Sequence, residues 1–303
     1  MENKEKRAEN FYRSLLEYTA SLFDKFTAKS ELNFESIQKM IKMTCEFVRL
    51  DNNHIVYAMQ TAKPYYNPHV SHAARSSIVA IIIGTYLKLP RHQLIELGIA
   101  GLLCNISLLK MSGRVYASSE EGTNLLNAGT EAEKRLMYVH PIHAHKILKA
   151  SNFPLSICEG VLQHHELEDG SGFPQQLKRE AICIYGKILA VAGFYEAFSM
   201  EHIDGIKCGH RGIVQILKNG GTFDTSVIRA LVNSISIYPV GVYVLLSNGK
   251  RGQVSEIDQD NPRFPTVEIF GEESPREIVR TYDELFIVRP LTSEEVEGTS
   301  EKK

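Results

Sequence analysis

The chain carries the stretch His164-His165-Glu166-Leu167-Glu168-Asp169-Gly170-Ser171-Gly172-Phe173-Pro174, in which two adjacent histidines precede a glycine-rich turn. Neutral imidazoles beside a carboxylate suit Zn, Fe or Mn. The glycines let the backbone approach a ligand closely. We interpret the stretch as a metal-ligating segment followed by a tight, shaped loop, in which Asp169 anchors the turn by an Asx-type hydrogen bond.

Composition restricts the classes of protein to consider. The chain has 303 residues, 43% of them hydrophobic and 23% charged, which is ordinary for a globular protein. Its formal net charge of -2 gives no indication of nucleic-acid binding. The apolar run at 78–83 is too short to span a bilayer, and the first residues show no signal-peptide pattern. Five scattered cysteines indicate reduced thiols. We therefore expect a cytoplasmic protein without membrane insertion.

Hydrophobic periodicity predicts a mostly α-helical fold with a small β element near its end. Asn67-Pro68 is typical of a helix start, with an N-cap followed by proline at the first helical position. Further helices are expected at 94–109, 132–150, 157–165, 184–199 and 213–217. Strands are expected at 242–246, 252–257 and 266–270, with a hairpin turn at Asn248-Gly249.

These patterns divide the chain into four parts. Residues 1–63 are expected to form an N-terminal helical segment, and 64–238 a helical domain. Residues 239–290 would form a small β appendage, and the Glu/Ser/Lys-rich residues 291–303 a disordered tail.

Histidine spacing adds candidate ligands outside the doublet. His69 and His72 lie three residues apart, as do His140 and His143, so each pair shares a helix face. Such pairs converge on one ion if their helices pack together. The alternative is that these histidines are surface residues or hydrogen-bonded core residues. For His164-His165, beside the glycine-rich loop, we favour a site.

Several strings together resemble the HD-GYP family of metal-dependent cyclic di-GMP phosphodiesterases, over about residues 65 to 290. They are the doublet stretch, His72-Ala73-Ala74-Arg75-Ser76-Ser77-Ile78, Gly101-Leu102-Leu103-Cys104-Asn105-Ile106-Ser107 and His140-Pro141. Two more, Gly220-Gly221-Thr222-Phe223-Asp224 and Tyr238-Pro239-Val240-Gly241, match family strings of uncertain role.

The resemblance implies a helical HD-GYP-like bundle with N-terminal accessory helices and a small C-terminal β element. It implies that His72, His140, His164 and His165 occupy metal-ligand positions, where they would hold one divalent ion (Fe, Mn or Zn) or none. It also implies that Gly172, Phe173, Pro174 and Lys178 belong to a substrate loop for cyclic di-GMP. Phe173 replaces the family's tyrosine.

The chain departs from the family pattern where catalysis needs it most. Cys104-Asn105 stands at the His-Asp pair, Leu108 at a lysine position, and Gly193 where a ligand aspartate is expected. His202-Ile203-Asp204 occupies the place of a phosphate-holding Arg-Pro-Tyr segment. A neutral amide at Asn105 lacks the charge that holds two metal ions together. We predict an impaired two-metal site, with Cys104 filling a core gap rather than ligating as a thiolate.

Four functions remain open at this point. The first is a catalytically impaired signalling module that acts through another signalling protein, or through cyclic di-GMP binding without hydrolysis. The second is an active cyclic di-GMP phosphodiesterase with a rearranged single-metal site that uses Cys104 together with His69 or His143. The third is a hydrolase for a different phosphorylated substrate, and the fourth a helical scaffold without a ligand. For Glu166, a hydrogen bond to an imidazole and an exposed position are equally open.

Overall fold

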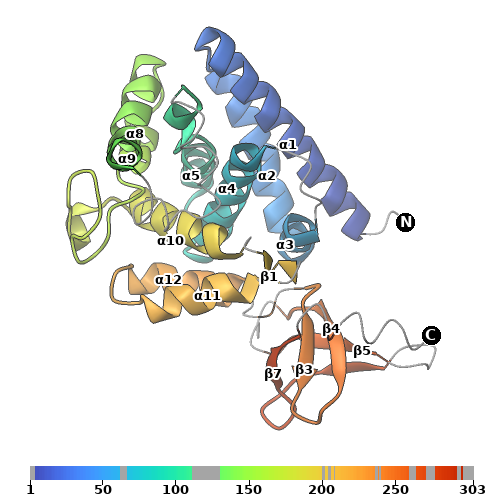
Figure 1. The fold of residues 1–303 in the computed structure, drawn as a ribbon. Coiled ribbons are helices and arrows are strands. Elements are labelled where there is room, and N and C mark those ends of the chain that lie inside the picture. Colours follow the sequence, from blue (N-terminus) through green and yellow to red (C-terminus); the bar gives the residue numbers. More distant parts are fainter. Residues whose placement is uncertain are drawn as a thin grey trace.

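A computed structural model describes residues 4–61, 67–110, 130–199, 202–203, 206–207, 209–235, 238, 240–258, 264–270, 277–291 and 295. Helices form the larger part, and a small antiparallel sheet follows them near the C-terminal end (Figure 1). The mostly α fold with a C-terminal β element that the sequence predicts is therefore confirmed.

The helical part contains three N-terminal helices followed by those that carry the predicted site. The helices are α1 (Lys4–Lys29), α2 (Phe34–Leu50), α3 (Asn52–Thr61), α4 (Pro68–Tyr86), α5 (Arg91–Leu103), α8 (Glu131–Ala150), α9 (Leu155–Leu162), α10 (Ile184–Ser199), α11 (Gly209–Lys218) and α12 (Thr225–Ser234). Short 3-10 helices lie at Ile106–Lys110 and Arg179–Ala181. Helix α4 begins as predicted, because Asn67 accepts from the N–H of His69 and Pro68 occupies the first helical position.

One hydrophobic core runs through the helical part. It contains residues from Ala8 of α1 to Ile235, just after α12, so the N-terminal helices share a core with the helices that carry the site. The centre of this core is α4, in which Ile78, Ile81 and Ile83 are fully buried. Burial of such side chains stabilises the fold by about 1.5–3 kcal/mol each. The core thereby fixes the relative positions of α4, α8, α9 and α10.

The predicted helix at 94–109 differs from the observed structure. Helix α5 ends at Leu103, and a turn at Cys104 and Asn105 leads into the 3-10 helix. The run of apolar, buried residues continues through this break, because Ile106 and Leu108 are buried as well. Periodicity alone could not locate the interruption, which falls on the Cys104-Asn105 pair.

By length and composition, the stretch Arg91–Lys110 is apolar enough to cross a membrane, with a mean hydropathy of 1.4. However, 67% of this stretch is buried inside the fold. Helix α5 packs against α4, α2 and α9. Its apolar character is thus explained by its place in the helical core.

The C-terminal sheet has five strands: β3 (Tyr243–Leu246), β4 (Arg251–Glu256), β5 (Thr266–Ile269), β6 (Ile278–Arg280) and β7 (Ile287–Pro290). They pair antiparallel in the order β6-β5-β4-β3-β7. The predicted hairpin turn is confirmed, because Gly249 has a φ of +80° and Leu246 donates to the carbonyl of Lys250 at 2.9 Å. The sheet has a hydrophobic core of its own.

Two predicted segments fall largely outside the described residues. The expected tail at 291–303 is described at Leu291 and residue 295 alone. Within the His202-Ile203-Asp204 string, the backbone of His202–Ile203 forms strand β1, which pairs with β2 (Ile206–Lys207). Asp204 lies outside the described residues.

Candidate metal centre

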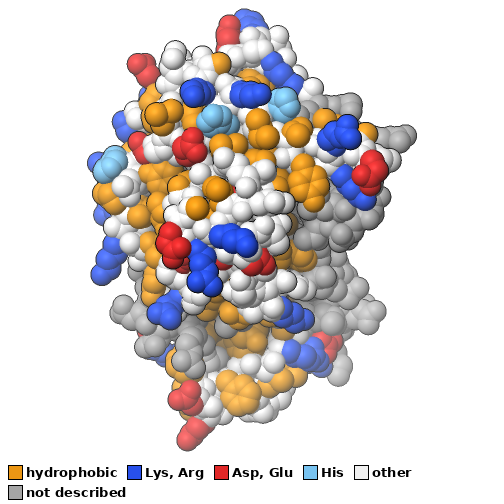
Figure 2. All heavy atoms as spheres, turned by 90° about the vertical axis from the view of Figure 1, so that its left-hand side faces the viewer, with side chains coloured by type: hydrophobic (Ala, Val, Ile, Leu, Met, Phe, Trp, Pro, Cys, Tyr) orange, Lys and Arg blue, Asp and Glu red, His pale blue; other side chains and the backbone are white. Residues whose placement is uncertain are grey.

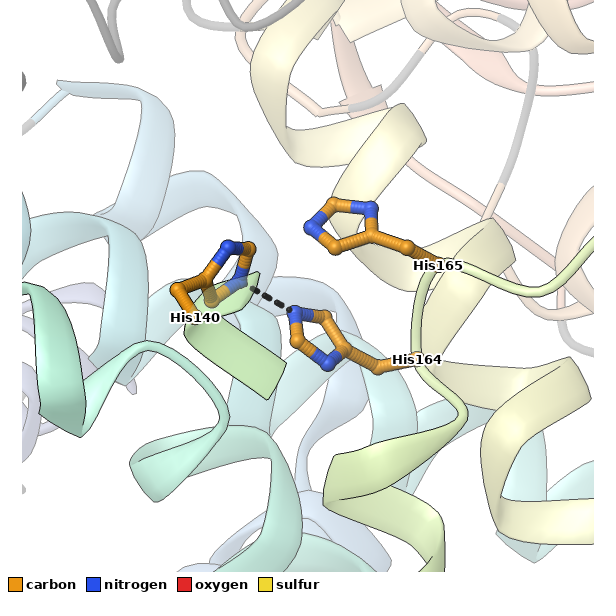
Figure 3. A group of neighbouring side chains, drawn as sticks. All are labelled: His140, His164 and His165. Atoms are coloured by element: carbon orange, nitrogen blue, oxygen red, sulfur yellow. Dashed lines mark hydrogen bonds between the residues drawn. The ribbon is translucent and has the colours of Figure 1, made fainter. Parts of the chain in front are cut away.

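Three histidines from two segments form a compact cluster (Figure 3). His140 lies in α8, and His164 and His165 follow the end of α9. One ring nitrogen from each lies within 4.8 Å of the others. His140 and His164 are buried and His165 is partly buried. The structure therefore brings together three of the four predicted metal ligands.

Local backbone geometry fixes which nitrogen of His140 and His164 faces the cluster. Pro141 has no N–H to donate to the carbonyl of Met137 one turn back, and His140 Nδ1 lies 2.6 Å from that carbonyl instead. His164 Nδ1 lies 2.6 Å from the carbonyl of Val161, near the end of α9. A ring nitrogen at this distance from a carbonyl must donate. The neutral rings therefore present unprotonated Nε2 atoms to the cluster.

Electrostatics keep the cluster neutral. Burial lowers the pKa of His140 well below 6.5, and that of His164 to about 4. Burial together with the neighbouring imidazoles also lowers the pKa of His165. At neutral pH the three rings are thus uncharged, which is the form that ligates metal ions.

This donor set fits a single divalent cation. The Nε2 atoms of His140 and His164 lie 3.1 Å apart, and with both Nδ1 atoms donating elsewhere there is no proton to share between them. Two nitrogens bound to one zinc at about 2.0–2.1 Å lie about 3.3 Å apart in a tetrahedral arrangement. A cation between these nitrogens would use both lone pairs. Imidazole ligands suit Zn, Fe or Mn.

His72, the fourth predicted ligand, lies outside the three-histidine cluster. Its Nδ1 contacts a carboxylate oxygen of Glu196 on α10, and its Nε2 lies 3.4 Å from the hydroxyl of Ser76. The other oxygen of Glu196 accepts from Nε of Arg75 at 2.7 Å. Burial alone would raise the pKa of Glu196, but His72 and Arg75 lower it to about 2. Both oxygens of this buried carboxylate are thus already engaged.

Cys104 and Asn105 lie in the turn after α5. The Cys104 thiol is buried and lies 3.5 Å from the carbonyl of Gly101, to which it donates. Burial raises its pKa to about 12, so without a bound metal ion the sulfur is a protonated thiol at neutral pH. This agrees with the core-filling role that the sequence predicts. Leu108 is buried in the following 3-10 helix, so its side chain is part of the interior.

Gly193 marks open space on α10. A Cβ atom built on this glycine would meet no heavy atom within 4 Å. The position where the family resemblance implies an aspartate therefore has room for a side chain but carries none.

The predicted substrate loop packs against the histidine doublet. The ring of Phe173 stacks on that of His165, with centroids 4.5 Å apart, and the N–H of Phe173 donates to the carbonyl of His165 at 3.0 Å. The peptide bond between Phe173 and Pro174 is cis. The Lys178 side chain is exposed at the surface, and its aliphatic stem crosses Gly170.

Two acidic residues stabilise this loop. Asp169 accepts from the N–H of Ser171 at 2.9 Å, which confirms the predicted Asx-type turn. Glu166 is buried and accepts from the N–H groups of Gln175 and Leu177 at 2.6 and 2.8 Å. Of the two possibilities left open for Glu166, the exposed position is therefore wrong.

The extra histidines His69 and His143 also lie outside the cluster. His69 is buried near the start of α4, and His143 is exposed on α8. Sequence reasoning missed Glu196 altogether. One signal could have indicated it: Glu196 lies three residues after Gly193 and so shares its helix face.

Comparisons with known proteins agree with this architecture. The chain is 29% identical over 204 residues to the cyclic di-GMP phosphodiesterase PdeB of Borreliella burgdorferi, which covers 66% of this chain and 52% of that protein. It is 29% identical over 203 residues to the cyclic di-GMP phosphodiesterase PA4108 of Pseudomonas aeruginosa, which covers 66% of this chain and 47% of that protein. The chain thus spans about half the length of these curated relatives.

A solved structure shares the fold. The HDG"Y"P protein Bd1817 of Bdellovibrio bacteriovorus superposes with a TM-score of 0.62 and 14% sequence identity, covering 76% of this chain and 72% of that one. The sequence model of the HD domain matches residues 57–227, more than half of the chain. The chain belongs to the HD domain family, and the relatives and the solved structure agree with the expected resemblance to the HD-GYP group.

Proposed function

We propose that this protein is a catalytically impaired HD-GYP protein of the cytoplasm that binds one divalent metal ion and acts in cyclic-dinucleotide signalling without hydrolysing cyclic di-GMP. It would act through contacts with another signalling protein, or by binding the nucleotide without turnover. The observation that carries the proposal is a three-histidine cluster beside which the described residues place no carboxylate free to bridge a second metal ion.

His140, His164 and His165 would hold the ion. When bound there, a divalent metal supplies a Lewis acid that polarises a phosphoryl oxygen and acidifies water. The chain's own contribution is the orientation of two of the rings, because the carbonyls of Met137 and Val161 fix them with Nε2 toward the cluster.

A second ion lacks ligands in the described part of the chain. Asn105 offers a neutral amide, and Gly193 offers no side chain. Glu196 is the nearby buried carboxylate, but Arg75 and His72 occupy its oxygens. Removing Glu196 from this pairing would leave the Arg75 charge uncompensated in the interior, at a cost of about 3–5 kcal/mol.

Loss of the second ion is expected to have a large effect on rate. Two-metal phosphodiester hydrolysis stabilises both the attacking and the leaving oxygen. Removing several kcal/mol of this stabilisation lowers the rate by a factor of hundreds or more, since about 1.4 kcal/mol corresponds to tenfold.

Exposed hydrophobic side chains on three helices support contact with a protein partner. Tyr138 on α8, Leu155 on α9 and Ile184 on α10 are 48%, 64% and 39% exposed. Figure 2 views the face that includes α8 and α9, where hydrophobic side chains lie between charged ones and histidines. Of these side chains, an exposed tyrosine such as Tyr138 is of a type enriched at interaction sites.

The second candidate is a working cyclic di-GMP phosphodiesterase with a single-metal centre. It is favoured by the named activity of the relatives and by the three neutral imidazoles. In that case the metal and the loop around Phe173 would suffice for slow turnover.

One experiment separates the two candidates. Metal content per chain is measured by elemental analysis on protein purified without chelator, and cyclic di-GMP hydrolysis is measured on the same sample. His164→Ala is the test variant. His143→Ala is its matched control, because His143 lies on the same helix as His140 but outside the cluster.

We expect about one ion per chain in the wild type and the control, a loss of that ion in His164→Ala, and no turnover in any sample. Turnover that requires His164 would overturn the proposal in favour of the second candidate. Wild-type protein without stoichiometric metal would contradict the metal-binding part of the proposal.

A further inference from the structure

The string Gly220-Gly221-Thr222-Phe223-Asp224 lies beside the loop that carries the histidine doublet. The N–H of Glu168 donates to the carbonyl of Thr222 at 2.9 Å. Glu168 follows His165 by three residues. Thr222, which lies far from Glu168 in the sequence, thus contacts the segment that carries two of the three clustered histidines.

Lys187 strengthens the same contact from α10. Its Nζ lies 2.9 Å from Glu168 Oε1 and 3.0 Å from Asp224 Oδ2. The Lys187 side chain is 14% exposed, so solvent screens these ion pairs less than surface pairs. The ammonium group of Lys187 therefore joins the loop that carries the histidine doublet to the turn at Asp224.

The turn at Asp224 is itself held firmly. Asp224 is the N-cap of α12, where its side chain accepts from the N–H of Ser226 at 2.8 Å and of Val227 at 3.2 Å. Phe223 is buried and packs edge-on against Phe194, with ring centroids 5.0 Å apart. A rigid turn of this kind can fix the position of the loop that it contacts.

The doublet needs such a support because it lies beyond the end of a helix. Helix α9 ends at Leu162, so His164 and His165 stand in a turn without the backbone ladder that fixes His140 in α8. The separation between the doublet and His140 therefore also depends on contacts further along the loop.

We propose that Lys187 and Asp224 are positioning residues that hold His164 and His165 at metal-binding separation from His140. This inference rests on the proposed metal-binding function and extends it to a support that lies outside the ligand set. Outer supports of metal ligands typically change metal affinity by about 10–100-fold when removed.

The test measures the dissociation constant of Zn²⁺ by competition with a chelating dye, using the full chain. Lys187→Met removes the charge and keeps the stem, and Lys187→Arg is the conservative variant. Asp224→Asn weakens the ion pair but keeps an N-cap acceptor. Lys134→Met is the matched control, because Lys134 is a 27% exposed lysine on α8 whose ion-pair partner among the described residues is Glu131, at 3.1 Å. The melting temperature of each metal-free variant reports any purely structural effect.

We expect Lys187→Met to weaken Zn²⁺ binding by about 10–100-fold, Asp224→Asn to weaken it less, and Lys187→Arg to restore most of it. Lys134→Met should bind like the wild type. If Lys187→Met does not fold, Asp224→Asn and Lys187→Arg carry the test.

Unchanged Zn²⁺ affinity in the folded variants, whatever their melting temperatures, would overturn the positioning role while leaving the proposed function intact. A wild type that binds no Zn²⁺ would overturn the metal-binding part of the proposed function, and the positioning role with it.

Discussion

At the scale of single residues, the centre is built by backbone geometry as much as by its histidines. Pro141 cannot supply the backbone N–H that would bond to the carbonyl of Met137 one turn back, and Nδ1 of the His140 ring lies at hydrogen-bonding distance from this carbonyl. The ring thereby points Nε2 toward the cluster. The His-Pro string is thus explained by the orientation of a ligand, which sequence comparison alone could not reveal.

Gly172 is a second residue whose identity the geometry requires. A Cβ atom there would lie 2.4 Å from both the carbonyl oxygen of His165 and the N–H nitrogen of Leu167. From the sequence we expected the glycines of this loop to let the backbone approach a ligand closely. The approach is to the chain's own backbone behind the doublet, which spacing could not foresee.

Gly172→Ala should therefore disturb the doublet directly. Backbone atoms cannot rotate away from the added methyl group, so we expect a loss of about 1–3 kcal/mol in the free energy of unfolding together with weaker Zn²⁺ binding. Urea unfolding and chelator competition measure the two effects. Gly221→Ala serves as the control, because its Cβ would meet no heavy atom within 4 Å. Equal stability and equal affinity in the two variants would show that the loop tolerates the methyl group.

At the scale of helices, α10 lacks an aspartate at Gly193 but carries a buried carboxylate at Glu196. Gly193 leaves open space, while Glu196, one turn later, pairs with Arg75 and His72 of α4. Sequence reasoning found the first feature because a family motif marks the position. It missed the second because the partners are more than a hundred residues away along the chain. Most helices followed from hydrophobic periodicity, but the contacts between them did not.

Two glycines on neighbouring helices give opposite predictions for the same substitution. Gly193→Ala should stabilise the protein by about 0.5–1 kcal/mol, because glycine inside a helix costs that much relative to alanine and nothing obstructs the methyl group. Gly101→Ala on α5 should destabilise it, because a Cβ there would lie 2.9 Å from the Cα of Ser77 in α4. Thermal unfolding followed by circular dichroism compares both variants with the wild type. A rise in melting temperature for Gly101→Ala would contradict this prediction, because it would mean that α4 and α5 can shift apart to accommodate the methyl group without loss of stability.

At the scale of the whole molecule, the described residues form one hydrophobic core among the helices and another in the sheet. The helical core extends to Ile235, and the sheet encloses its own core around Val244 and Val267. Tyr57 of α3 packs against the sheet core, and Asn53 donates to the carbonyl of Ile257 at 2.9 Å. The sequence predicted a separate β element from its change of period. It gave no sign that α3 would be the helix that receives this element, because the contact depends on tertiary packing.

This arrangement predicts that the sheet can be loosened from the helices without loss of the metal centre. Gly241 has a φ of +90°, and a Cβ there would lie 2.7 Å from the ring of Tyr57. Gly241→Ala should therefore increase amide hydrogen exchange in α3 and at the sheet surface that faces it, while Zn²⁺ affinity stays at the wild-type value.

Gly249→Ala is the matched control: its φ of +80° imposes a similar backbone strain, but its Cβ would meet nothing within 4 Å. The clash with Tyr57 is thus the feature that separates the two variants. Faster exchange in Gly241→Ala alone would identify Tyr57 as the contact that joins the two cores, whereas equal exchange in both variants would assign the effect to strain. A loss of Zn²⁺ binding in Gly241→Ala would contradict the independence of the two cores, because it would require the sheet to support the distant histidine cluster.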